Sequence, residues 1–154
     1  MGGLSSEREI SLRTGSAILT ALQERGYQAV ALDVERSIAA KLSSAAIDAA
    51  FIALHGMLGE DGAIQGLLEI MGIPYTGSGV FASALAMNKV AAKKIFVYHN
   101  LPTPAFHAVY VDEAGCAEEA LKGITLSYPV IIKPSEEGST IGVTIVHRKE
   151  DLLQ

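Results

Sequence analysis

Hydrophobic and polar positions in the first half of the chain alternate between helical and strand-like periods. Apolar residues recur at helical spacing after a Ser-x-x-Glu capping box at residues 6–9, and Gly26 is placed to end this helix. Apolar runs typical of buried strands lie at residues 28–32, 49–54 and 73–76. Helical patterns separate these runs. Strands that alternate with helices predict an α/β fold with a Rossmann-like parallel sheet.

The pattern changes in the second half of the chain. Ser78 is placed to cap a long helix that runs through His99, and the proline-containing segment NLPTPAF then ends it. Beyond this break, strands are expected at residues 106–111, 130–133 and 143–147, with a helix near 113–122. This order of elements predicts a mixed α+β unit. We therefore expect two domains, residues 1–86 and 87–154.

Both ends of the chain look cut. A doubly wound domain ordinarily enters its first helix from a strand, whereas this chain opens on Gly2-Gly3. We therefore expect the first strand of the sheet to be missing. At the other end, the segment KEDLLQ resembles the first turns of an unfinished helix.

Composition narrows the class of protein. The chain has 154 residues, of which 49% are hydrophobic and 19% charged, as is typical of a globular protein. The formal net charge of −5 argues against nucleic acid as a partner, and no apolar run is long enough to cross a membrane. The single cysteine forms no internal disulfide, and no Cys/His cluster indicates zinc. We expect a cytoplasmic protein.

The loop KPSEEGSTIG, residues 133–142, lies between the last two predicted strands. Backbone N–H groups of a glycine-bearing turn can form an anion-binding nest, and Lys133 could reach the same phosphates from the end of its strand. The loop is no Walker A motif, because no Gly-Lys-Ser/Thr follows. A hairpin with a solvated lysine explains the same pattern, so both interpretations stay open.

Lys89 and His55 are two further candidate binding residues. Lys89 falls beside the apolar stripe of its helix, where a lysine either extends to solvent or meets a buried anion; Lys93 and Lys94 are expected to point into solvent. His55 directly follows the 49–54 run, at the sheet edge where open α/β folds bind ligands. A hydrogen bond from His55 to its own loop is the alternative.

Glu7 is a candidate because Glu9 is sufficient to complete the capping box. A carboxylate in the first helical turn is then available to bind an ammonium group. Compensation of the helix dipole also explains this position, and the local pattern taken alone favours that explanation.

Five stretches together resemble, in order and spacing, the D-alanine–D-alanine ligases of the ATP-grasp superfamily. They are GGLSSEREISL, FIALHGMLGEDGAIQGLLEIMGIPYTGSG, ALAMNK, LPTPAF and YPVIIKPSEEGSTIGV. The resemblance covers nearly the whole chain. It implies a Rossmann-like domain without its first strand, followed by an incomplete ATP-grasp subdomain. It also implies a fragment, because family members run to roughly twice this length.

The resemblance implies a two-step reaction that serves peptidoglycan synthesis. ATP phosphorylates the carboxylate of one D-alanine, and the amine of a second D-alanine then displaces phosphate to give the dipeptide. Carried over by position, Glu7 holds the ammonium of the first D-alanine and His55 helps to place its carboxylate. Ser139 links the 133–142 loop to Glu7 by a hydrogen bond.

The resemblance also implies an ATP site. Lys89 and Lys133 bind the nucleotide phosphates, and four loop residues that include Ser139 form a cover over them. The other three are Glu137, Gly138 and Thr140, the last standing where a serine is more usual.

The ligands for Mg²⁺ (or Mn²⁺), the transition-state arginine and the lid loop of the family have no counterpart here, so we expect the isolated chain to be inactive. Full-length family members are commonly homodimers. Two alternatives stay open: a non-catalytic remnant that binds nucleotide or a partner protein, and another ATP-grasp carboxylate–amine ligase. The second shares Lys89 and Lys133 but does not require the stretches around Glu7 and His55. The choice between D-alanine and D-lactate as second substrate is also open.

Overall fold

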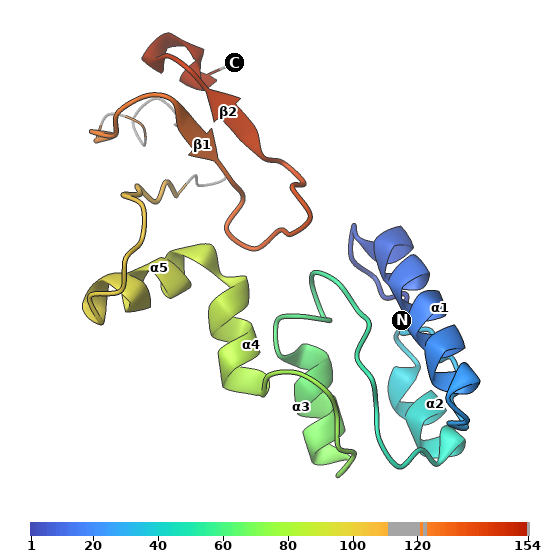
Figure 1. Ribbon diagram of the computed structural model, residues 1–154. Helices are drawn as coiled ribbons and strands as arrows, with labels where there is room; N and C mark the ends of the chain where they lie inside the picture. The colour runs from blue at the N-terminus through green and yellow to red at the C-terminus, as the bar shows by residue number, and fades with distance from the viewer. Residues whose placement is uncertain (111–120, 122, 154) are drawn as a thin grey trace.

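The computed structural model describes residues 1–110, 121 and 123–153 and has an α/β fold. Figure 1 shows helices α1 and α2 at one end of the molecule and a β-hairpin near the C-terminus at the other, with α4 and α5 between them. None of the described helices is long and apolar enough to span a membrane.

The first predicted helix is confirmed as α1 (Arg8–Glu24), and Gly26 follows it with a φ of +84°. The predicted capping box is wrong. Glu7 occupies the N-cap position, and no side chain caps the helix. The Ser6 hydroxyl instead donates a hydrogen bond of 3.1 Å to Glu137 in the distant 133–142 loop. A tertiary contact has therefore replaced the local one.

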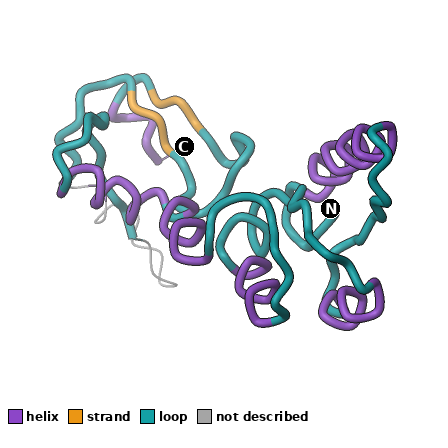
Figure 2. The backbone as a smooth tube through the Cα atoms, turned by 60° about the horizontal axis from the view of Figure 1, so that its bottom comes forward, coloured by secondary structure: helices purple, strands orange, loops and turns teal. Residues whose placement is uncertain are grey.

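The three predicted strands of the N-terminal half do not form as continuous strands. Figure 2 shows loop where they were expected: between α1 and α2 (Ile38–Ala45), between α2 and α3 (Ala63–Ile70), and directly after α3. Two isolated parallel bridges are present, Gly2 with Val34 and Ala50 with Tyr75. A strand requires a neighbour that pairs along its length, and the apolar pattern of a segment does not supply one. Of the two bridges, the one between Ala50 and Tyr75 joins two of the predicted segments in the predicted parallel direction.

The long helix predicted from Ser78 to His99 is two helices, α4 (Val80–Met87) and α5 (Lys89–Tyr98). Asn88 separates them in an extended conformation, with φ −83° and ψ 102°. Ser78 does not cap α4, because Gly79 holds the N-cap position. An asparagine is a poor residue in a helix interior and a good one at an N-cap, which explains the break.

Lys93 of α5 does not point into solvent as predicted. Its Nζ donates hydrogen bonds to Thr103 Oγ1 at 2.9 Å and to the Pro104 carbonyl at 2.7 Å, and it lies 5.1 Å from the centre of the Phe106 ring. The lysine therefore fastens the segment after α5 to the helix. Lys94, by contrast, is exposed as predicted.

The predicted C-terminal hairpin is confirmed with shorter strands, β1 (Val130–Ile132) and β2 (Thr144–Val146). They pair antiparallel, with Val130 opposite Val146. A 3₁₀ helix, Lys149–Leu153, follows where a helix start was expected. No strand forms over 106–110, and the helix predicted near 113–122 lies mostly outside the described residues.

The core lies between α2, α3 and the segment before His55. It consists of Leu42, Leu54, Ile64 and Leu68, all 7% exposed or less. Burial of such side chains stabilises each by about 1.5–3 kcal/mol. The core thus holds residues 50–54 in place and fixes the position at which His55 emerges.

Candidate active site

The Glu7 side chain is the centre of the candidate site. It is only 2% exposed, although Glu7 is the N-cap residue of α1, a position that is usually open to solvent. The Ser139 hydroxyl donates a hydrogen bond to Glu7 Oε2. The second carboxylate oxygen, Oε1, is buried and has no hydrogen-bond partner among the described residues. A buried carboxylate oxygen without a donor is costly, so this atom marks a place where a donor is needed.

Two glycines leave room for the Glu7 carboxylate. A Cβ atom on Gly138 would lie 2.6 Å from Glu7 Oε1, and one on Gly56 would lie 2.9 Å from the same oxygen. Both distances are below 3.0 Å, within which a real Cβ atom essentially never approaches another heavy atom. The glycines therefore allow the 133–142 loop and the loop after His55 to approach Glu7 from two sides.

His55 is joined to Glu7 through Ser5. The Ser5 hydroxyl donates to the His55 carbonyl at 2.7 Å and accepts from the Glu7 backbone N–H at 3.2 Å. The imidazole itself is 29% exposed, with Nε2 3.3 Å from Thr14 Oγ1 and Nδ1 4.0 Å from Glu60 Oε1. The backbone segments that carry Glu7 and His55 are therefore joined through Ser5, whereas the His55 ring contacts Thr14 and Glu60.

Lys89 contacts the 133–142 loop directly. Its Nζ donates to the Glu137 carbonyl at 2.5 Å and to the Ser135 carbonyl at 3.4 Å. Its backbone N–H also donates to the Ser135 carbonyl, at 3.0 Å. Neither of the two interpretations left open for this lysine describes the contact, because the ammonium group meets neutral backbone carbonyls of the loop and not open solvent or a buried anion. The loop and the N-terminus of α5 form one unit.

Lys133 is exposed and directly follows β1. No hydrogen bond or ion pair between described residues joins it to Lys89 or Glu7. Thr140 is also exposed, and its hydroxyl donates to the Ser139 carbonyl at 2.6 Å. Ser139 and Thr140 have φ values of 47° and 63°, so the loop turns sharply at two successive residues.

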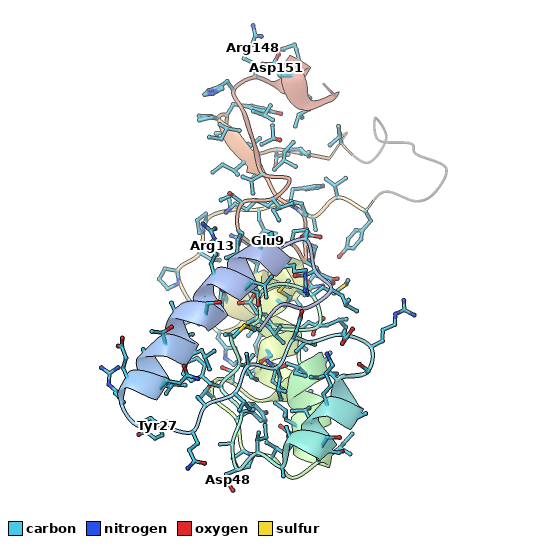
Figure 3. All side chains as sticks on the ribbon, turned by 90° about the vertical axis from the view of Figure 1, so that its right-hand side faces the viewer. Glu9, Arg13, Tyr27, Asp48, Arg148 and Asp151 are labelled. Carbon is cyan, nitrogen blue, oxygen red and sulfur yellow. The ribbon has the colours of Figure 1, made fainter. Side chains whose placement is uncertain are left out.

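The 133–142 loop is held from two helices. On the α1 side, Ser6 binds the Glu137 carboxylate and Ser139 binds Glu7. On the α5 side, the bonds of Lys89 are joined by one from Asn88 Nδ2 to Glu136 Oε1, 2.7 Å long. Figure 3 shows α1 with its Glu9 end nearer the C-terminal hairpin and its Tyr27 end farther away, which agrees with these contacts.

An ion pair fixes the chain just before α1. The Arg8 guanidinium donates to both Asp33 oxygens and, at 3.0 Å, to the Gly3 carbonyl. This hydrogen bonding holds the pKa of the Asp33 carboxyl below its usual value. Gly2 has a φ of +76°, and a Cβ there would collide with Asp33. The start of the chain is thereby held beside residue 33, with Glu7 following from it.

An open cleft of about 400 Å³ lies beside the site, between the segment before His55, α3 and α4. Its polar lining includes Glu60, Gln65, Thr76 and Ser83. None of the residues predicted from the sequence for binding or catalysis lines this cleft. Of the predicted residues, Glu7 contacts Ser139 and Lys89 contacts Glu137, where the start of α1, the start of α5 and the 133–142 loop meet. The His55 ring, which lies at Thr14 and Glu60, and the exposed Lys133 are not part of these contacts.

Three residues that bind the loops together were missed in the sequence: Ser5, Ser6 and Asn88. Ser6 was assigned to a capping box and Asn88 to a helix interior. Only the preference of asparagine for N-cap positions could have singled out Asn88. Nothing in the local pattern of Ser5 or Ser6 indicates a partner 50 or 131 residues away.

Comparison with known proteins places the chain in a family. A family model described as "D-ala D-ala ligase N-terminus" matches residues 33–78, and one described as "D-ala D-ala ligase C-terminus" matches residues 95–154. Proteins named D-alanine–D-alanine ligase from Desulforudis audaxviator and Geotalea uraniireducens are 56% and 58% identical to it over 153 residues. The alignments cover 99% and 98% of this chain but 49% and 47% of the relatives.

A comparison with solved structures gives the same family. The crystal structure of the D-alanine–D-alanine ligase from Bacillus anthracis complexed with ATP matches with a TM-score of 0.76 and 34% identity. The match covers 99% of this chain and 50% of that protein. The chain spans about half the length of the relatives it matches. On sequence, family models and fold together, this chain belongs to the D-alanine–D-alanine ligase family.

Proposed function

We propose that the chain contributes the first D-alanine site and part of the ATP site of a D-alanine–D-alanine ligase. The observation that carries the proposal is the buried Glu7 Oε1 without a hydrogen-bond partner among the described residues. The ammonium group of an amino acid supplies both the positive charge and the N–H donors that this oxygen lacks. Family membership supports D-alanine as that amino acid.

In this proposal His55 and Ser139 position what Glu7 binds. The imidazole emerges from a buried segment next to Glu7 and is partly exposed, so a ring N–H can donate to the substrate carboxylate. Ser139 holds one carboxylate oxygen of Glu7 and so directs the other toward the substrate. Both functions belong to binding and orientation, which raise the rate by bringing reacting groups together.

We propose that Lys89 and Lys133 bind ATP phosphates, with Glu137, Gly138, Ser139 and Thr140 covering them. Lys89 already lies against the loop, and Lys133 is exposed at the end of β1. The ligase from Bacillus anthracis that resembles this chain was solved with ATP. A loop closed over the phosphates would also exclude water, which protects an acyl phosphate from hydrolysis.

The metal is proposed to be bound outside this chain. No group of three or more His, Cys, Asp or Glu residues within the described part of the chain could hold a metal ion. Mg²⁺ needs oxygen ligands such as carboxylates. We propose that the ligands for Mg²⁺ (or Mn²⁺) belong to the half of the family members that this chain does not span. The 154-residue chain is then inactive alone, and robust phosphate release from ATP with D-alanine and Mg²⁺ would contradict this.

The finer description of the fold follows from the same proposal. Residues 1–86 form a Rossmann-like substrate domain, and residues 87–154 form part of an ATP-grasp subdomain. The two parallel bridges support the first assignment, and the hairpin beside Lys89 supports the second. For the whole ligase we propose a cytoplasmic homodimer.

Binding of D-alanine to the 154-residue chain, measured by calorimetry, tests the proposed function. Replacement Glu7→Gln keeps an acceptor for Ser139 but removes the charge, and we expect affinity to fall by about tenfold or more, since hydrogen bonds to charged groups contribute about 1.5–3 kcal/mol. Glu9→Gln, on the exposed side of the same helical turn, is the matched control and should leave affinity unchanged. Equal affinities for Glu7→Gln and the unaltered chain would refute the assignment.

A further inference from the structure

Asn88 uses both ends of its side-chain amide. The oxygen, Oδ1, accepts a hydrogen bond of 2.9 Å from the Ala91 N–H and thereby caps α5. The nitrogen, Nδ2, donates one of 2.7 Å to Glu136 Oε1 in the 133–142 loop. One side chain thus joins the start of the helix that carries Lys89 to the loop that Lys89 also contacts.

The two bonds make opposite chemical demands. The helix N-terminus needs an acceptor, and aspartate would meet that need as well as asparagine. The Glu136 carboxylate needs a donor, and an aspartate at residue 88 would instead present it with a second negative charge. Among residues that cap helices well, asparagine alone supplies an acceptor and an N–H donor on one short planar group.

The hydrogen bonds of Lys89 also attach the 133–142 loop to the start of α5. The Lys89 backbone N–H and Nζ bind the carbonyls of Ser135 and Glu137, so three consecutive loop residues are attached to two consecutive residues at the start of α5. Lys89 is held by backbone oxygens on the loop, whereas Asn88 holds a loop side chain. The Asn88 bond therefore adds a side-chain attachment to the backbone attachments that Lys89 makes.

We propose that Asn88 is a positioning residue that holds the 133–142 loop against the N-terminus of α5, in the arrangement required for the phosphate site. The effect on nucleotide binding rests on the proposed function. The attachment of the loop does not, because it concerns the chain without nucleotide. The two are therefore measured separately.

Replacement Asn88→Asp tests the proposal because it preserves the cap and removes only the donor. We expect amide hydrogen exchange of loop residues 135–142, followed by mass spectrometry on the nucleotide-free chain, to speed up by about threefold to tenfold. Exchange in α5 should stay unchanged, since the cap remains. Asn88→Ala, which removes cap and donor together, should speed exchange in both segments.

A second substitution supplies the decisive control. In Asn88→Asp/Glu136→Arg the donor moves to the loop, and an aspartate–arginine pair replaces the amide–carboxylate pair. We expect loop exchange to return to within about twofold of the unaltered chain. Unchanged exchange in Asn88→Asp, or no recovery in the double variant, would overturn the proposal; so would a loop that exchanges at the unprotected rate in the unaltered chain.

Binding of a non-hydrolysable ATP analogue to the same variants measures the consequence. We expect affinity to fall in Asn88→Asp and to recover in the double variant, in parallel with loop exchange. Parallel changes in both measurements support the positioning role. Loop exchange that responds while affinity does not would overturn the role in forming the phosphate site. Absence of binding by the unaltered chain would count against the proposed ATP site and not against the attachment of the loop.

Discussion

Two oxygens of one carboxylate have different surroundings at the centre of the site. Glu7 Oε2 is engaged by Ser139, whereas the buried Oε1 has no donor among the described residues. The sequence pattern could place Glu7 only near a helix start, where it favoured dipole compensation as the explanation. The resemblance to a ligase family added the link to Ser139, and the hydrogen bond confirms that this link forms. The roles of both residues in binding D-alanine stay predictions.

Gly138→Ala is expected to disrupt the site through size alone, because Gly138 does not have a positive φ. The added Cβ would lie 2.6 Å from Glu7 Oε1, so either the loop or the Glu7 carboxylate must shift, and either shift disturbs the Ser139 bond. We expect a loss of stability of about 1–3 kcal/mol, measured by urea denaturation, and weaker D-alanine binding.

Gly66→Ala is the matched control for Gly138→Ala. Gly66 lies inside α3, and the nearest atom to a Cβ placed there belongs to Val80, at 3.8 Å. We expect it to stabilise the chain by about 0.5–1 kcal/mol, since alanine is favoured over glycine in helices. Unaltered stability and D-alanine affinity in Gly138→Ala would show that the loop does not pack against Glu7 in solution.

At the scale of elements, local patterns predicted α1 and the C-terminal hairpin well, because periodicity and turn residues are properties of neighbouring positions. They failed for the strands near residues 28–32, 49–54 and 73–76. Those segments have suitable apolar runs, but a strand also needs a partner along its length. Among the described residues a single bridge, Ala50 with Tyr75, joins two of them, and residues 28–32 take part in none. The break at Asn88 was missed because the apolar pattern continues across it from α4 to α5.

Lys93→Ala tests an element contact that the sequence pattern did not indicate. The substitution removes two hydrogen bonds and a cation–π contact between α5 and residues 103–106. We expect a loss of stability of about 1 kcal/mol in urea denaturation. Lys94→Ala, at the exposed neighbouring position, should change stability by less than about 0.5 kcal/mol. Equal effects of the two substitutions would contradict the role given to Lys93.

At the scale of the whole molecule, residues far apart in sequence meet at one place. Glu7 lies 132 positions from Ser139, and Lys89 lies 48 positions from Glu137. Spacing in a sequence cannot predict such meetings, although a family resemblance can. The chain spans about half the length of the relatives it matches. We therefore propose that the chain binds the first D-alanine and part of ATP in a ligase whose metal ligands lie in the other half of the enzyme.

A crystal structure of the chain with D-alanine tests the central claim most directly. The account predicts the ammonium nitrogen within about 3 Å of Glu7 Oε1, with the Ser139 bond to Oε2 retained and the substrate carboxylate on the His55 side. D-alanine bound elsewhere, or oriented with its carboxylate toward Glu7, would contradict the account.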